Sequence, residues 1–167
     1  MNDIIKHIIL FVVLFLLQVI VLNNVNFWGF INPMLYILFV FVYPFKKTKA
    51  EVMLLSFFMG LGIDLFLNSG GTNAAATLFI AYIRLPLLKA LLRKTDIDLQ
   101  VFNLSKLPFS KLLSFIIILT FSHHFVVFGL EYFKWSALGT ILIRTFLTGI
   151  FTIILIIFSL LLMNKGK

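Results

Sequence analysis

Six long apolar runs, separated by short polar loops, constrain the fold of this chain more than any other feature of its sequence. A backbone in hydrocarbon has no water to bind, so runs of this length predict helices that cross a membrane. Hydrophobic residues make up 62% of the 167 residues and charged residues 12%, whereas roughly a quarter of an ordinary soluble domain is charged. We therefore expect one all-α membrane domain over residues 1–167, a single bundle of six transmembrane helices. Its spans are expected at about 8–22, 31–45, 52–67, 74–92, 112–130 and 138–163.

The basic residues divide unevenly between alternate loops. Eleven of the 14 Lys and Arg residues lie at the two chain ends and in the segments 46–51 and 89–111, and only Lys134 lies in the other loops. Cytoplasmic loops carry this excess of positive charge, so we expect both termini and the lysines of 46–51 to be cytoplasmic. The net charge of +8 is then explained by topology and by contact with membrane lipids, and it does not indicate binding to nucleic acid.

Ionisable side chains inside the apolar runs are the strongest candidates for a functional site. Asp64 lies near the end of the third run, and Arg84 and Arg144 lie within the fourth and the sixth. Such groups are costly in a membrane and usually face the interior of the bundle, where they find partners. From the depth of each residue, at about 1.5 Å per residue, we expect Asp64, Arg84, Arg144 and His123 to form one polar cluster in the outer half of the bundle.

This cluster has two interpretations. The simpler is a structural ion pair between Asp64 and an arginine that holds the helices together. In the other, the excess positive charge of two guanidinium groups binds a lipid phosphate, an anionic ligand or the carboxylate of a partner protein. The sequence leaves open whether Arg84 or Arg144 pairs with Asp64.

Four glycines flank Asp64 and favour close packing and a tight turn. Gly60 and Gly62 precede it in the third run, where small residues let another helix approach closely. Gly70 and Gly71 lie in the uncharged turn between the third and fourth runs, where glycine adopts backbone conformations that other residues avoid.

The sequence lacks the patterns typical of catalytic and metal sites. Asp64 is the only acidic residue inside an apolar run, whereas an aspartyl protease needs two carboxylates that share a proton. The chain has no cysteine, no phosphate-binding loop and no HExxH motif. His123 and His124 are adjacent and point about 100° apart on a helix, so buried hydrogen-bonding histidines are the simpler interpretation. We therefore expect no catalytic residue, no metal, no cofactor and no enzymatic activity.

Short motifs follow one another in order over about residues 10–95. They are Leu17-Gln18, Pro33-Met-Leu-Tyr36, Tyr43-Pro44, Gly60-Leu-Gly-Ile-Asp-Leu-Phe66, Gly71-Thr-Asn-Ala74 and Ala81-Tyr-Ile-Arg84. This ordered set resembles the bacterial rod shape-determining protein MreD family, whose motif falls on Gly60, Asp64, Gly71 and Arg84. The second half of the chain resembles the family in length and hydropathy only.

The resemblance implies a noncatalytic protein of the bacterial cytoplasmic (inner) membrane. Such a protein acts in the elongasome, the machinery of peptidoglycan synthesis that supports rod shape. The partners implied are a bitopic MreC-like protein, the cell-wall synthase formed by RodA and a transpeptidase, and an MreB-like cytoskeletal protein. The resemblance also implies a fold similar to the six-helix substrate-binding subunits of energy-coupling-factor transporters.

A second function class follows from the same fold, namely a small-molecule-binding subunit of such a transporter. Subunits of that class often dock through Ala-xxx-Ala surfaces, but no two alanines of this chain lie four residues apart. The expected outer loops are also short, which leaves little chain to cap a soluble ligand. Both observations favour the scaffold over the transporter subunit. The residual positive charge of the polar cluster is also compatible with binding of a polyprenyl-linked precursor.

Overall fold

A computed structural model describes residues 3–25, 29, 31–100 and 102–165, which are mostly helical and contain no extended strand. The long helices are α1 (Asp3–Leu16), α3 (Lys49–Leu67), α4 (Thr72–Leu92), α5 (Phe109–Tyr132) and α6 (Leu138–Lys165). α1 continues through a π-helical turn, η1 (Leu17–Val21), and a 3-10 turn, η2 (Leu22–Asn24). The short helix α2 (Leu38–Val42) follows the 3-10 turn η3 (Leu35–Ile37), and two further 3-10 turns are η4 (Leu104–Lys106) and η5 (Trp135–Ala137).

Five helical segments of the described chain are long and apolar enough to cross a membrane. They are Ile4–Asn24, Lys49–Leu67, Thr72–Leu92, Phe109–Tyr132 and Trp135–Met163. Five of the six expected spans are therefore confirmed as helices of suitable length and composition. Their outward-facing side chains include many large apolar groups, such as Ile8, Leu142 and Phe158, as contact with lipid requires.

The segment expected as the second span, residues 31–45, takes a different form. Its helical part, η3 and α2 together, has eight residues and covers about 12 Å, much less than the ~30 Å of a hydrocarbon core. Every side chain from Leu35 to Phe41 is buried inside the protein. An apolar run indicates burial, and its pattern does not distinguish burial in protein from burial in lipid.

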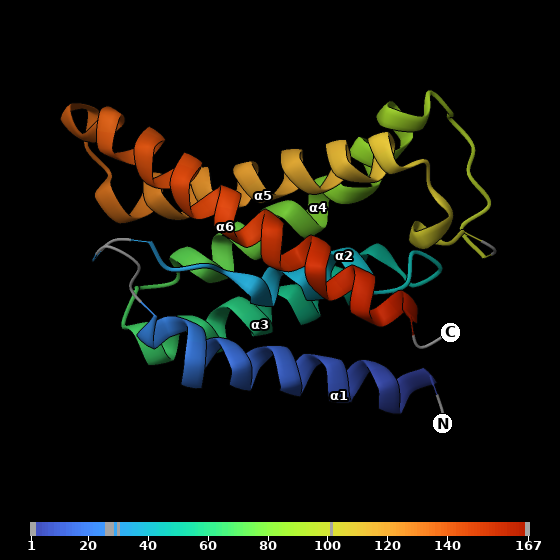
Figure 1. Cartoon of the computed structure of the whole chain (residues 1–167), viewed down its shortest axis with the longest axis horizontal. Coiled ribbons are helices and arrows are strands. Elements are labelled where there is room, and N and C mark those ends of the chain that lie inside the picture. The colour runs from blue at the N-terminus through green and yellow to red at the C-terminus, as the bar shows by residue number, and fades with distance from the viewer. Residues whose placement is uncertain (1–2, 26–28, 30, 101, 166–167) are drawn as a thin grey trace.

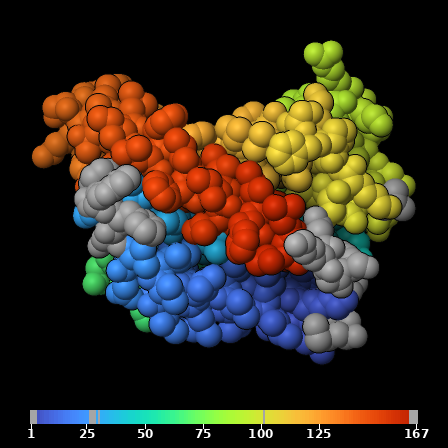
Figure 2. Space-filling model, in the orientation of Figure 1, coloured from blue at the N-terminus to red at the C-terminus, as the bar shows by residue number. Residues whose placement is uncertain are grey.

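The long helices surround α2, which lies near the centre of the bundle (Figure 1). The consecutive pairs α3–α4, α4–α5 and α5–α6 pack against each other, while α1 runs along one edge and α6 crosses in front of α2. In the same orientation, the side chains of α1 and α6 leave little of α2 visible (Figure 2). The start of α1 and the end of α6 lie at the same end as the basic turn after α2, and the α3–α4 and α5–α6 turns lie at the opposite end.

Single cysteines at Lys94 and Ser136 are expected to be labelled from opposite sides of the membrane. Both positions are exposed, and Lys94 follows α4 whereas Ser136 lies in the α5–α6 turn, at the other end of the bundle. The chain has no cysteine of its own, so there is no background labelling. An impermeant maleimide added to intact cells should label S136C, and should label K94C only after lysis. The reverse pattern would contradict cytoplasmic termini, and labelling of both in intact cells would contradict the fold.

Gly60 lies where α3 and α4 approach each other closely. A Cβ atom at this position would lie 2.5 Å from the backbone oxygen of Asn73 and 2.6 Å from Cα of Ala74. At Gly62 the added atom would instead meet the ring of Phe15 from α1, at 2.6 Å. The two glycines thus lie at close contacts with two different helices.

Gly60→Ala is expected to lower the free energy of unfolding by about 2 kcal/mol, because backbone atoms block the added methyl group. Gly62→Ala should cost less, since the ring of Phe15 can turn aside. Gly129→Ala in α5 is the control, because its Cβ meets no atom within 4 Å and alanine favours the helix. Far-UV circular dichroism during unfolding in mixed micelles of increasing SDS content measures all three. Equal stability of G60A and G129A would contradict the close α3–α4 contact.

Candidate functional site

Polar side chains from two other helices satisfy the backbone where the buried segment begins. Gln18 of η1 donates from Nε2 to the carbonyl oxygen of Pro33 at 3.0 Å and accepts at Oε1 from the amide of Tyr36 at 3.3 Å. Thr152 of α6 accepts at Oγ1 from the amide of Met34 at 3.0 Å. An irregular backbone inside a membrane protein needs such partners, because an unpaired buried amide is costly.

Arg84 of α4 satisfies the other end of the same segment. Its guanidinium donates from Nη1 to the carbonyl oxygen of Val40 at 2.6 Å and from Nη2 to that of Tyr43 at 2.9 Å. The last carbonyls of a helix lack partners and carry partial negative charge, so a cation is stabilising there. The ring of Phe45 covers the guanidinium, with 4.1 Å between Cζ and the ring centroid. Arg84 is only 3% exposed, so its hydrogen bonds to α2 lie in the core of the bundle.

Asp64 caps the start of α4. Its Oδ1 accepts hydrogen bonds from the backbone amide of Asn73 at 3.0 Å, from Nδ2 of Asn73 at 2.9 Å and from the hydroxyl of Ser69 at 2.5 Å. Its Oδ2 accepts from the backbone amide of Ala74 at 2.8 Å. The first amides of a helix have no partner within the helix and carry partial positive charge, which favours a carboxylate at this position.

The turn between α3 and α4 makes this cap possible. Gly70 and Gly71 have φ values of +67° and +93°, in the left-handed region that favours glycine. Asn68 ends α3 in the same region, with φ of +51°. The chain thereby reverses over four residues, and a carboxylate from the last turn of α3 reaches the first amides of α4.

The structure does not bring Asp64 and Arg84 together. Arg84 lies twelve residues after the start of α4, about 18 Å along the helix axis, and its side chain reaches the end of α2 that leads into the basic turn. The depth of a residue along its helix does not determine the direction in which a long arginine extends. Among the residues that the structure describes, neutral groups hold both charges, and neither forms an ion pair with the other.

His123 does connect to Asp64, through two intermediate side chains. The hydroxyl of Tyr36 donates to Oδ1 of Asn73 at 2.6 Å and lies 3.1 Å from Nε2 of His123. Because the hydroxyl hydrogen goes to Asn73, Nε2 of His123 is the donor in the second contact. Asn73 in turn donates to Asp64, so a buried chain of hydrogen bonds links α3, α4, η3 and α5.

His124 binds different partners from His123. Its Nδ1 lies 2.8 Å from the carbonyl oxygen of Thr120, and its Nε2 lies 3.2 Å from Oγ1 of Thr152 on α6. The two rings thus serve separate contacts, as their positions on the helix indicate. Through Thr152, His124 connects to the backbone of the buried segment.

Arg144 lies near this network without joining it. Its guanidinium lies over the ring of Tyr132, with 5.5 Å between Cζ and the ring centroid. It also lines a cavity of about 230 Å³ that Ser69 and Asn73 border. Arg144 and Asp64 therefore flank one polar region, but no hydrogen bond joins them within the described part of the chain.

Four side chains of the network were not expected from the sequence to belong to the site: Gln18, Tyr36, Asn73 and Thr152. Each lies inside or beside an apolar run, where a polar group needs a specific partner. Tyr36 and Asn73 lie in the short sequence motifs Pro33-Met-Leu-Tyr36 and Gly71-Thr-Asn-Ala74, and their place there is the signal that could have pointed to them. Gln18 belongs to another of those motifs, whereas Thr152 has no signal beyond its place in an apolar helix.

In the described part of the chain, Asp64 and Arg84 both bind backbone groups. The carboxylate of Asp64 and the guanidinium of Arg84 are each engaged by several hydrogen-bond partners. Within the described ranges, no group of three or more His, Cys, Asp or Glu side chains is placed to hold a metal ion. Comparison of the chain with protein-family models, curated proteins and solved structures gave no match.

Proposed function

We propose that this protein is a noncatalytic scaffold of the bacterial cell-elongation machinery, similar to MreD and located in the cytoplasmic membrane with both termini inside. The observation that carries the proposal is the role of the four residues on which the family motif falls. Gly60 permits the close α3–α4 contact, Gly71 forms the turn before α4, Asp64 caps α4, and Arg84 holds the end of α2. All four residues stabilise the packing of the helices. A motif with this structural role suits a protein that acts by binding partners.

Exposed apolar faces supply surfaces for such partners within the membrane. Ile4 and Val12 on α1, and Phe146 and Phe158 on α6, are each more than 40% exposed. In this proposal an MreC-like bitopic protein and the RodA–transpeptidase synthase contact helix faces of this kind. An MreB-like protein contacts the cytoplasmic end.

The presence of a cavity beside Arg144 is the observation that raises a second candidate, a substrate-binding subunit of an energy-coupling-factor transporter. This cavity lies at the end of the bundle opposite the basic turn, where an external ligand would enter. Its volume of about 230 Å³ is below the ~300–1,000 Å³ typical of small-molecule sites. The size of the cavity therefore favours the scaffold.

Mass spectrometry of proteins that copurify from native membranes in mild detergent tests the two candidates together. The scaffold predicts recovery of an MreC-like bitopic protein and a transpeptidase. Paired ATPases with a coupling membrane subunit would contradict the scaffold and assign the chain to a transporter. A multi-pass membrane protein with the same tag and expression level is the control bait, and partners recovered equally with both baits are discarded.

A further inference from the structure

A groove opens between the first half of α1 and helices α2 and α3, at the end of the bundle that carries the basic turn. It encloses about 570 Å³, within the ~300–1,000 Å³ of sites that hold small molecules. It is separate from the hydrogen-bond network around Asp64 and from the cavity beside Arg144, since neither of these residues lines it.

The groove exists because α1 packs on different helices along its length. In its second half, Phe15 lies directly over Gly62 of α3. One turn earlier, Phe11 contacts α2 instead, with 5.3 Å between the ring centroids of Phe11 and Phe39. The space between the start of α3 and the part of α1 from Ile4 to Phe11 stays open.

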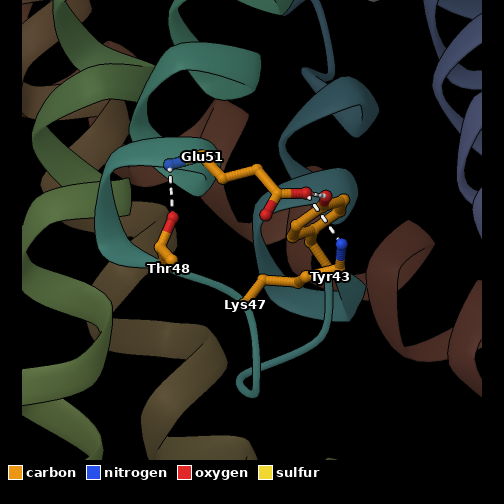
Figure 3. Close-up of polar contacts among 4 residues, drawn as sticks. All are labelled: Tyr43, Lys47, Thr48 and Glu51. Carbon is orange, nitrogen blue, oxygen red and sulfur yellow. Dashed lines mark hydrogen bonds and ion pairs between the residues drawn. The ribbon is translucent and has the colours of Figure 1, made fainter.

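The lining of the groove is mostly apolar along α1 and α2, and its rim, at the basic turn and the start of α3, is charged. Figure 3 shows the rim, where the hydroxyl of Tyr43 and Nζ of Lys47 both approach Oε1 of Glu51, at 2.5 Å and 3.1 Å. Thr48 fixes this corner by accepting a hydrogen bond from the amide of Glu51. Lys46 and His7 also line the groove, and with histidine counted as neutral the lining carries two positive charges and one negative charge.

We infer that the groove binds one anionic phospholipid, with its phosphate at Lys46 and Lys47 and an acyl chain along Phe11, Phe39 and Leu55. An apolar floor below a rim of net positive charge is complementary to an amphiphile with a negative head. The basic turn belongs to the end expected at the cytoplasmic leaflet, whose anionic lipids attract lysines close to the surface.

The dimensions of the groove favour a lipid over a helix of a partner protein. On α1 the lining residues run from Ile4 to Phe11, about 11 Å along the axis, whereas a transmembrane helix follows about 30 Å of hydrocarbon. The contact of Phe15 with Gly62 closes the space beyond. A flexible acyl chain fits a groove of this length.

Native mass spectrometry of the full-length protein, titrated in mild detergent with phosphatidylglycerol or phosphatidylcholine, tests the inference. We expect phosphatidylglycerol to bind about fivefold more tightly, since each charge near the surface contributes about 1 kcal/mol, which is fivefold. Lys46→Gln with Lys47→Gln should weaken phosphatidylglycerol binding by at least tenfold. Glu51→Gln keeps an oxygen for the hydroxyl of Tyr43 and should strengthen binding about fivefold. Lys94→Gln is the control for surface charge outside the groove and should change nothing.

Two neighbouring substitutions to tryptophan distinguish lipid binding in the groove from general attraction of lipid to the protein surface. Ile8 lines the groove and is 57% exposed, whereas its neighbour Ile9, 47% exposed, does not line it. Ile8→Trp should fill the groove and abolish binding of the lipid, and Ile9→Trp should leave it unchanged. Equal affinities of wild type for the two lipids, or equal binding by I8W and I9W, would overturn the inference. Benzoylphenylalanine at position 8, activated in native membranes, should crosslink to lipid, and a crosslinked polypeptide would assign the groove to a partner protein instead.

Discussion

Arg84→Met is expected to lower the free energy of unfolding by about 4 kcal/mol. Methionine fills a similar volume but donates no hydrogen bond, so the carbonyls of Val40 and Tyr43 lose their charged partner inside the bundle. Each buried acceptor left unpaired costs about 1–3 kcal/mol. The stability of Arg84→Lys should lie between those of the wild type and Arg84→Met. An ammonium group reaches one carbonyl but does not bridge both, as the planar guanidinium does.

Unfolding in mixed SDS micelles, followed by circular dichroism, measures this loss. Arg144→Met is the matched control, because it removes the same group from a partly exposed position over the ring of Tyr132. We expect its effect to stay below about 1 kcal/mol. If R84M and R144M unfold at the same SDS content, the hydrogen bonds of Arg84 do not hold α2 in place.

Asp64→Ala is expected to cost about 3 kcal/mol of unfolding free energy. The substitution removes the acceptor for the amides of Asn73 and Ala74 and for two side-chain donors, at a position that is only 4% exposed. Asp64→Asn keeps one oxygen but places its own amide hydrogens near these donors, so it should also destabilise. Asp98→Ala is the control, because Asp98 is exposed and, among the described residues, accepts a hydrogen bond from the neighbouring amide of Gln100.

The combination of the two substitutions distinguishes the observed arrangement from the ion pair that the sequence suggests. Among the residues that the structure describes, Asp64 and Arg84 share no hydrogen-bond partner, so their effects should add to within about 0.5 kcal/mol in the double variant. An ion pair would make the double variant considerably more stable than the sum of the two losses. Such coupling, measured in the same unfolding assay, would count against the structure.

The five long helices and the glycine turn follow from the sequence because their physical causes are local. An apolar run of 18 or more residues has few alternatives to a helix, and Gly70 and Gly71 supply the left-handed conformations of the turn. The clustering of lysines likewise indicates which chain segments lie at one end of the bundle. Each of these features depends on neighbouring residues and needs no knowledge of distant contacts.

The partners of the polar groups do not follow from the sequence, because they depend on contacts between distant residues. Arg84 binds carbonyls more than forty positions away, and any backbone carbonyl looks alike in a sequence. The short α2 is as apolar as a transmembrane span. Only the structure shows that protein, and not lipid, surrounds it. The structure links His123 to Asp64 through Tyr36 and Asn73, which the sequence does not single out because neither carries a charge.

The dependence of α2 on other helices has a consequence for the order of events during biogenesis. Residues 31–45 are synthesised early, yet the side chains that hold their backbone come from η1, α4 and α6, the last of which is synthesised at the end of the chain. A helical stretch of about 12 Å cannot cross the bilayer alone. This segment therefore reaches its final position after the later helices have been inserted and begin to pack. In a chain truncated before α6, residues 31–45 would be exposed to lipid or to proteases. Burial of this segment therefore indicates that all the helices have packed.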